Sequence, residues 1–319
     1  MTTEAIEQIK QDRLENNLLQ DMKDLLVYLE DKSVTDIAIP DSGEIIITRF
    51  GKGREFTGKF LSEVMTQRII LATAALNGKQ LETYTGFPIL EGIIPSYNAR
   101  ITGLMKPNTK RPELQIRLPP KVIYSLEDYV DSKKMTQENY EEVCRYIQER
   151  KNIVVSGSTG SGKTTFTNAV IKKMVEITPN DNFYIIEDVP ELQCTAKMKT
   201  MLYVPKEFAK KAVEESLRWS PDRIIFGEVR NGIVMKELLE AWNTGHPGNV
   251  TTIHADSGYS TLLRIKGMLG ENKDIQLSDT IQLVVHLKKT KEGIKVDELY
   301  PVNDETDSFL DTVYQNNLA

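Results

Sequence analysis

The sequence is poor in the residues that build disulfide frameworks and metal sites. Its 319 residues include two cysteines, Cys144 and Cys194, and three histidines. No CxxC spacing occurs, and His246, His254 and His286 do not show metal-ligand spacing. These absences argue against a disulfide scaffold and a cysteine zinc site, and they suit a reducing cytoplasm.

Long apolar runs and an excess of basic charge are also missing. No apolar run reaches the length needed to cross a bilayer, and the polar, acidic N-terminus does not have the form of a secretory signal. The net charge is −6 and the sequence pI is about 5.4, which argues against a protein whose main task is general nucleic-acid binding. We therefore expect a cytoplasmic protein without a direct, sequence-specific nucleic-acid partner.

The length predicts about two domains, and residues 1–120 have the pattern of an α+β domain. Asp41-Ser42-Gly43 is a hairpin signal between two strand-like runs. The first helical stretch is expected to pack on its own domain, because its polar face is not rich in basic residues; a membrane-surface or partner helix is the alternative. The predicted helices are residues 4–30 and 62–76, and the predicted strands are 34–40, 44–50, 99–105 and 113–118.

Regular structure is interrupted at Pro119-Pro120, and residues 121–135 have the pattern of a linker in which Ser125 caps a short turn. Residues 136–319 then alternate helical and apolar strand patterns, which predicts a mostly parallel sheet with helices on both faces. The acidic tail from Val296 is expected to be peripheral. The predicted elements are a helix at 136–150, capped by Thr136, and strands at 183–186, 224–226, 249–253 and 281–287.

The segment Ile153–Thr165 carries the strongest functional signal. A short β-branched stretch precedes Gly157-x-x-x-x-Gly162-Lys163-Thr164, and helical spacing follows. This is the phosphate loop of a nucleoside triphosphatase, in which glycines let backbone N–H groups surround an anion at a helix N-terminus. We expect Lys163 to neutralise the β- and γ-phosphates of ATP and Thr164 to ligate Mg²⁺. The predicted phosphate-binding residues are Gly157, Ser158, Thr159, Gly160, Ser161, Gly162, Lys163, Thr164 and Thr165.

Carboxylates follow two of the predicted buried strands. Glu187, Asp188 and Glu191 come after the strand at 183–186, and Glu228 comes after the strand at 224–226. Open α/β sheets bind ligands at the carboxyl ends of their strands. Either acidic segment alone would be a solvated strand end. Beside a phosphate loop, the two together favour catalysis, with Glu187 and Glu228 holding Mg²⁺ through water.

A histidine follows a third predicted strand. His254 comes directly after Thr251-Thr252-Ile253, so it would lie near the γ-phosphate and could report its presence. The alternative is a structural, hydrogen-bonded histidine, which is the commoner role.

Together these segments resemble the secretion traffic ATPases. The run Ala241–Gly248 is most similar to the conjugal-transfer branch, the TrbB-like and VirB-type ATPases of type IV secretion, and the resemblance covers roughly residues 30–290. The Walker A, aspartate, Walker B and histidine boxes of that family have counterparts, in the same order, at Gly157–Thr165, Glu187–Leu192, Gly227–Arg230 and Thr244–Ala255.

The resemblance implies a C-terminal RecA-like ATPase domain and a smaller N-terminal sensing domain, arranged as a hexameric ring with nucleotide between the two domains. It also implies arginines of the first domain against the phosphates, for which Arg100 and Arg117 are the candidates here. In such a site Glu228 would be the main catalytic carboxylate, and His254 would take part. Inner-membrane secretion or conjugation components would be the partners, with peripheral attachment to the membrane through them.

The function expected from the resemblance is ATP hydrolysis that powers a type IV secretion or conjugative DNA-transfer apparatus. The alternatives are a type IV pilus or type II secretion motor and a slowly hydrolysing, nucleotide-gated scaffold. The chain lacks a cysteine-rich zinc insert and an extended N-terminal region, as found in type II assembly ATPases, which favours conjugation. The loop Lys106–Arg111 and its neighbours match the family only loosely.

Overall fold

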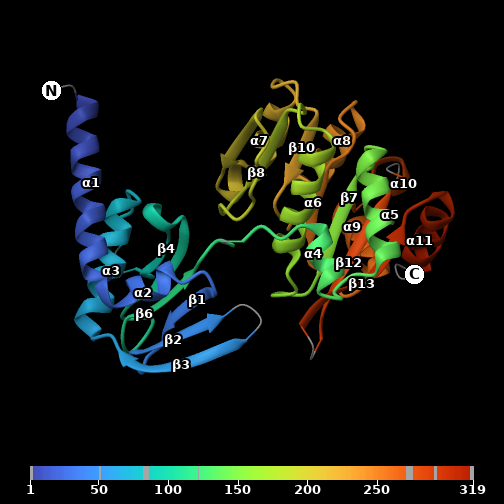
Figure 1. The fold of residues 1–319 in the computed structure, drawn as a ribbon. Helices are drawn as coiled ribbons and strands as arrows, with labels where there is room; N and C mark the ends of the chain where they lie inside the picture. Colours follow the sequence, from blue (N-terminus) through green and yellow to red (C-terminus); the bar gives the residue numbers. More distant parts are fainter. Residues whose placement is uncertain are drawn as a thin grey trace. The chain divides into compact units, whose positions relative to one another are not determined.

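The computed structural model describes residues 3–49, 52–81, 86–120, 122–270, 276–290 and 293–316. The chain forms two compact units, Met1–Val122 and Ile123–Ala319, each built on its own sheet (Figure 1). Phe50 and Lys121, which fall within predicted segments, lie outside the described residues. None of the described helices is long and apolar enough to cross a membrane.

The first unit is a six-stranded antiparallel sheet in the order β3-β2-β1-β6-β5-β4. Gly43, with φ 77°, turns the predicted hairpin between its first two strands. The strands are β1 (Val34–Ile39), β2 (Glu44–Arg49), β3 (Gly53–Phe60), β4 (Ile89–Ile94), β5 (Ala99–Leu104) and β6 (Glu113–Arg117).

Helices cover one face of this sheet. They are α1 (Thr3–Asp21), α2 (Lys23–Glu30) and α3 (Glu63–Leu76), and the short 3-10 helix η1 (Pro95–Tyr97) lies between β4 and β5. Leu18, Met22, Leu25 and Leu29 are fully buried in the core of the unit, which confirms that the stretch packs on its own domain from Leu18 onward, while Ile9 is exposed. The single predicted helix is wrong in one respect, because Met22 departs from helical geometry (φ −89°, ψ 8°) and divides it in two.

The second unit is a seven-stranded sheet in the order β13-β12-β7-β11-β10-β8-β9. Neighbouring strands are parallel except β13, which is antiparallel to β12. The strands are β7 (Ile153–Gly157), β8 (Phe183–Glu187), β9 (Lys199–Tyr203), β10 (Arg223–Phe226), β11 (Val250–Ile253), β12 (Leu283–Thr290) and β13 (Gly293–Pro301).

Helices cover both faces of this sheet, so successive strand residues enter two different cores. Ile153 and Val155 pack with α4, α5 and α6, while Val154 packs with helices on the other face. This double burial explains the continuous apolar strands, and it confirms the predicted α/β class. The helices are α4 (Leu126–Asp131), α5 (Gln137–Gln148), α6 (Lys163–Ile177), η2 (Lys206–Phe208), α7 (Ala209–Ser216), α8 (Gly232–Asn243), α9 (Gly258–Leu269), α10 (Leu277–Thr280) and α11 (Asp304–Asn316).

The acidic tail contributes more to this unit than its composition predicts. Strand β13 pairs along the length of β12, and Val302 and Leu310 are buried in the second of the two cores. Lys295 and Asp297 of β13 are exposed, and these charges suggested a peripheral tail from the composition.

A buried charge cluster lies at the amino ends of the strands, opposite the phosphate loop. Arg223 has no exposed surface, and its Nε donates to Asp181 Oδ2 at 2.8 Å. Its other nitrogens donate to Thr178 Oγ1 and to the Gly248 carbonyl. Arg150 donates to the second Asp181 oxygen at 2.6 Å. A buried guanidinium is tolerated only when it is paired in this way.

Asp181→Asn should therefore lower the free energy of unfolding by about 3–5 kcal/mol, because Arg223 keeps its charge and loses its carboxylate. Urea unfolding followed by the fluorescence of Trp219 and Trp242, both in the second unit, measures this change. Glu214→Gln, at an exposed ion pair with Lys210, is the control and should cost no more than about 0.5 kcal/mol. Equal losses in the two variants would contradict the prediction.

Candidate active site

The phosphate loop connects β7 to α6, and other parts of the unit approach two of its glycines closely. A Cβ at Gly157 (φ 151°) would lie 2.5 Å from the Leu287 carbonyl oxygen and 2.4 Å from Ser161 Oγ. At Gly162 (φ 80°), it would lie 3.1 Å from Ile294 Cδ1 of β13. Glycine is therefore favoured at both positions by its positive φ and by the close approach of other atoms. These are the properties of an anion cradle, a loop whose backbone N–H groups surround an anion.

Lys163 is folded back into this loop. It is 7% exposed, and its Nζ donates to the carbonyl oxygens of Gly157 at 2.9 Å and Ser158 at 3.0 Å. Burial lowers the pKa of Lys163. The remaining predicted loop residues form the rim: Ser158, Thr159 and Gly160 are exposed, Ser161 is buried with no hydrogen-bond partner for its hydroxyl, and Thr164 and Thr165 are half-buried.

The parallel order β7-β11-β10-β8 brings the predicted acids and histidine to the same edge of the sheet as the phosphate loop. Glu187 is the last residue of β8, Glu228 lies two residues beyond β10, and His254 directly follows β11. The Val229 N–H donates to the Thr252 carbonyl at 2.9 Å, which fixes the turn that carries Glu228.

Glu187 holds the acidic loop together from a buried position. It is 4% exposed, and its Oε2 accepts the backbone N–H groups of Glu191 and Leu192, each at 2.9 Å. Its Oε1 has no hydrogen-bond partner. Burial raises the pKa of Glu187 to about 7, even though the two backbone donors lower it. An orphaned, buried carboxylate oxygen at this edge is suited to a water or metal-bound water.

Glu191 is the acid that contacts the expected magnesium ligand. The Thr164 hydroxyl donates to Glu191 Oε2 at 3.1 Å. Asn168, one turn further along α6, donates to the Glu191 carbonyl at 3.0 Å and accepts the Gln193 N–H at 2.8 Å. Asn168 was not predicted from the sequence, although its i,i+4 spacing from Thr164 places both on one helix face.

His254 links the phosphate loop to Glu228. Its Nδ1 is 3.3 Å from Lys163 Nζ, and its Nε2 is 2.7 Å from Glu228 Oε1. Because Lys163 can only donate, Nδ1 must accept, and the proton lies on Nε2. Burial and the Lys163 charge lower the pKa of His254 below its ordinary value, which favours this neutral form. The structure thus brings together these three predicted residues.

Arg230 joins Glu228 to the remaining acid. Its Nε donates to Glu228 Oε2 at 2.6 Å, and its Nη1 donates to Asp188 Oδ2. A hollow of about 40 Å³ beside them is lined by Glu187, Asp188 and Glu228 and by residues of η2, α7 and α8, which is enough space for water. Arg230 belongs to the Walker B-like segment Gly227–Arg230, but the sequence pattern predicted no role for it.

Arg100 and Arg117 lie in the first unit. They are register partners on β5 and β6 and therefore share one sheet face. Arg117 Nε is 3.0 Å from Asp36 Oδ1, and Arg100 Nη2 is 3.8 Å from Glu91 Oε1. Ala99 and Ile101 enter the core of the unit, so the arginine face is the one without helices.

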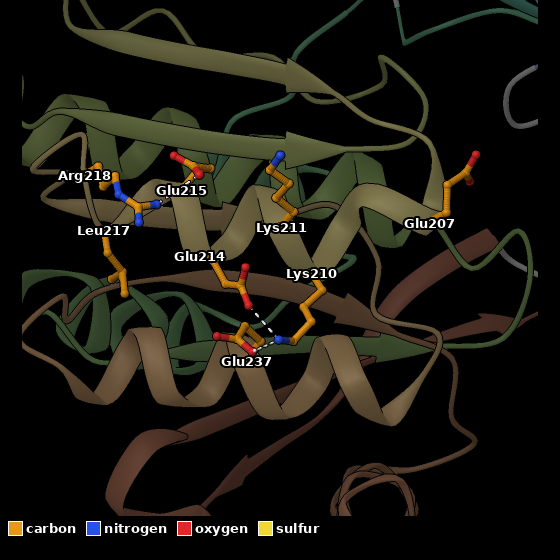
Figure 2. Close-up of a pocket in the computed structure, with 8 residues that line it drawn as sticks. All are labelled: Glu207, Lys210, Lys211, Glu214, Glu215, Leu217, Arg218 and Glu237. Carbon is orange, nitrogen blue, oxygen red and sulfur yellow. Dashed lines mark hydrogen bonds and ion pairs between the residues drawn. The ribbon is translucent and has the colours of Figure 1, made fainter.

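A larger hollow, of about 530 Å³, lies along α7 and is lined by none of the predicted site residues (Figure 2). Its charged side chains form ion pairs with each other, including Lys210 with Glu214 and Glu237, and Arg218 with Glu215. This lining is typical of a solvated helix surface and does not resemble a nucleotide site.

Within the described ranges, no group of three or more His, Cys, Asp and Glu side chains is arranged to hold a metal ion. A magnesium ion bound here would accordingly depend on Thr164, on water held by the acids and on phosphate oxygens, which is how magnesium binds with nucleotides.

The fold and this sheet edge define a phosphate-loop nucleotide-binding protein of the RecA-like α/β class. The family described as Type II/IV secretion system protein matches residues 20–303. The chain belongs to this family, which confirms the resemblance found in the sequence.

Individual relatives agree. The chain is 35% identical over 280 residues to the conjugal transfer protein TrbB of Rhizobium radiobacter, covering 86% of this chain and 85% of that protein. It is 30% identical over 171 residues to the type IV secretion system protein VirB11 of Bartonella quintana, covering 48% and 47%. These names agree with the function expected from the sequence.

Two solved structures share the fold. The pilus retraction motor PilT with bound ADP has a TM-score of 0.65 at 18% identity, covering 94% of this chain and 87% of that one. The ATPase DotB of Legionella pneumophila has a TM-score of 0.64 at 20% identity, covering 90% and 82%. At these identities the likeness shows the fold alone.

Gly157→Ala should weaken binding of magnesium nucleotide by on the order of tenfold or more. The added Cβ would clash with the backbone of Leu287 and push the phosphate loop out of position. Titration with a fluorescent ADP analogue measures this. Gly267→Ala, where the structure shows open space around a helical glycine of α9, is the matched control and should bind normally. Unchanged affinity in Gly157→Ala would show that the loop is not the binding site.

Proposed function

We propose that this protein hydrolyses ATP to ADP and phosphate with Mg²⁺, as a ring-shaped motor for a type IV secretion or conjugative DNA-transfer apparatus. The observation that carries the proposal is the contact chain from Lys163 through His254 to Glu228, beside a glycine cradle that excludes side chains. A TrbB relative that aligns over most of the chain supports the apparatus.

In this proposal, the phosphate loop and Lys163 hold the phosphates, and Thr164 holds the magnesium ion. When bound, the ion polarises the phosphate oxygens as a Lewis acid. Glu191 is the acid best placed for the magnesium water shell, because it already contacts Thr164. Glu187 Oε2 accepts the backbone N–H of Glu191, and Glu187 Oε1 is available to water.

Glu228 is proposed as the group that orients the attacking water. Its Oε1 lies on the side of His254 and Lys163, which is the side of the phosphates. In the structure this oxygen contacts His254. Nucleotide binding must therefore rearrange the contacts that join Lys163, His254 and Glu228. Lys163 would exchange its contacts with the loop carbonyls and His254 for phosphate oxygens. His254 would then be free to turn, and Oε1 would be released for water.

Arg100 and Arg117 are proposed to contact the phosphates from the first unit. The two arginines share one sheet face, and guanidinium groups match phosphate oxygens well. Arg100→Ala and Arg117→Ala are each expected to lower kcat, measured by steady-state phosphate release, without unfolding the chain. Wild-type turnover in both variants would remove this part of the proposal.

Lys163→Ala should abolish ATP turnover, because the positive charge that neutralises the transferred phosphate is lost. Glu228→Gln should lower kcat by about 10²–10⁴-fold, the usual contribution of a group that manages the proton of the attacking water. Steady-state phosphate release measures both variants.

Lys236→Ala, at an exposed ion pair on α8, is the matched control and should turn over normally. Circular dichroism checks that each variant is folded. A wild-type chain with negligible turnover, unchanged by Glu228→Gln, would favour the nucleotide-gated scaffold instead.

The ring is a further part of the proposal and predicts a change of mass in solution. We expect six copies to assemble, more completely with magnesium and ATP than without, because a ligand that binds the assembled form more tightly shifts the equilibrium toward it. Light scattering after size separation, with and without magnesium and ATP, measures the mass. A monomer under both conditions at high protein concentration would contradict the ring.

A further inference from the structure

Arg230 has no part in the proposed function so far, although it contacts two of the acids at the site. We propose that Arg230 is a positioning residue for ATP hydrolysis: it fixes the rotation of the Glu228 carboxylate so that Oε1 faces the phosphate loop. This inference rests on the proposed function, since it assigns a helper to the carboxylate that orients water.

The guanidinium holds one oxygen of Glu228 with two of its nitrogens. Nε and Nη2 both contact Oε2, and Nη1 donates to Asp188 Oδ2. The three nitrogens lie in one rigid plane, and we call this guanidinium group the fork. Because it contacts both acids at once, its orientation is fixed. Asp188 thereby helps to set the position of a carboxylate that it does not itself touch.

The backbone around Arg230 is fixed on both sides. Val229 is 1% exposed, and its N–H is bonded to Thr252 on β11. Asn231 caps α8, because its Oδ1 accepts the Val234 N–H at 3.0 Å. Arg230 therefore extends from a short turn held between a strand and a helix, which suits a group that positions another.

The fork decides which oxygen of Glu228 is available to water. With Oε2 held by Arg230, Oε1 points toward His254 Nε2, 2.7 Å away, and so toward the Lys163 side of the site. When His254 turns away on nucleotide binding, Oε1 is released while Oε2 stays held. Without the fork, the terminal torsion of the glutamate is broad and sets no preferred direction.

An ordinary surface ion pair is the alternative, because Arg230 is 40% exposed and such pairs contribute little. The chain offers a matched case. Arg145 on α5 also contacts two acids through three nitrogens: Nε and Nη2 donate to the two oxygens of Glu142, Nη1 donates to Glu149, and the side chain is 49% exposed. Any effect of Arg230 beyond that of Arg145 thus reflects its place at the site.

The experiment compares Arg230→Ala, Arg230→Lys and Arg145→Ala in the full-length protein. Arg230→Ala should lower kcat by about 10–100-fold, the usual cost of a misplaced reacting group, with KM for ATP and Kd for MgADP changed less than about twofold. Arg230→Lys keeps the charge but not the fork, so its kcat should also fall by about tenfold or more. Arg145→Ala should match the wild type in kcat, KM and Kd.

A second comparison tests the role of Asp188. Asp188→Asn should lower kcat less than Arg230→Ala, and adding it to Arg230→Ala should cause no further loss, because both act through one fork. Additive losses would mean that Asp188 acts separately, and they would overturn the bridging part of the proposal.

Three outcomes would overturn the role of Arg230 itself. They are a wild-type kcat in Arg230→Ala, a wild-type kcat in Arg230→Lys, which would leave charge as the only requirement, and a Kd for MgADP that weakens as much as kcat falls. Glu228→Gln separates this failure from a wider one. If Glu228→Gln is inactive and Arg230→Ala is normal, only the inference fails; if Glu228→Gln turns over normally, the proposed function fails.

Discussion

The parallel alignment of β7, β11, β10 and β8 is the constraint on which the candidate site depends. Each strand is covered on both faces, so a slip of one residue would move every side chain into the opposite core and disturb the packing of both cores. The fixed register places the carboxyl ends of all four strands at one edge. The phosphate loop, the acids and the histidine are close together because these strands end together.

This edge concentrates negative charge, and different donors hold each acid in place. Glu187 is held by backbone N–H groups, Glu191 by Thr164, and Glu228 by His254 and Arg230. Burial, with smaller contributions from the charges of Glu191 and Asp188, still raises the pKa of Glu187 to about 7. The arrangement gives each carboxylate a separate orientation, so that acids of one chemical type can serve different purposes.

Most of the second unit could be predicted from the sequence, because doubly buried strands and capped helices leave clear local signals. Ser125 and Thr136 cap α4 and α5 as expected. Strands β3, β4, β9 and β13 were not predicted; β3, for example, is exposed along most of its length and has no apolar alternation. Within the site, residue types indicated which groups take part. Their pairings depend on the order of the strands, which no local pattern contains, so the contacts of Asn168 and Arg230 appeared only in the structure.

The packing of Ile294 against Gly162 has a consequence for shortened versions of the chain. A protein cut before Gly293 would retain every motif that resembles the secretion ATPases, yet it would lose the strand that pairs with β12 and the side chain that packs on the loop. Such a fragment would leave an open sheet edge next to the cradle. If this fragment were inactive, the cause would be the lost support of the phosphate loop. The result would not show that the missing segment takes part in catalysis.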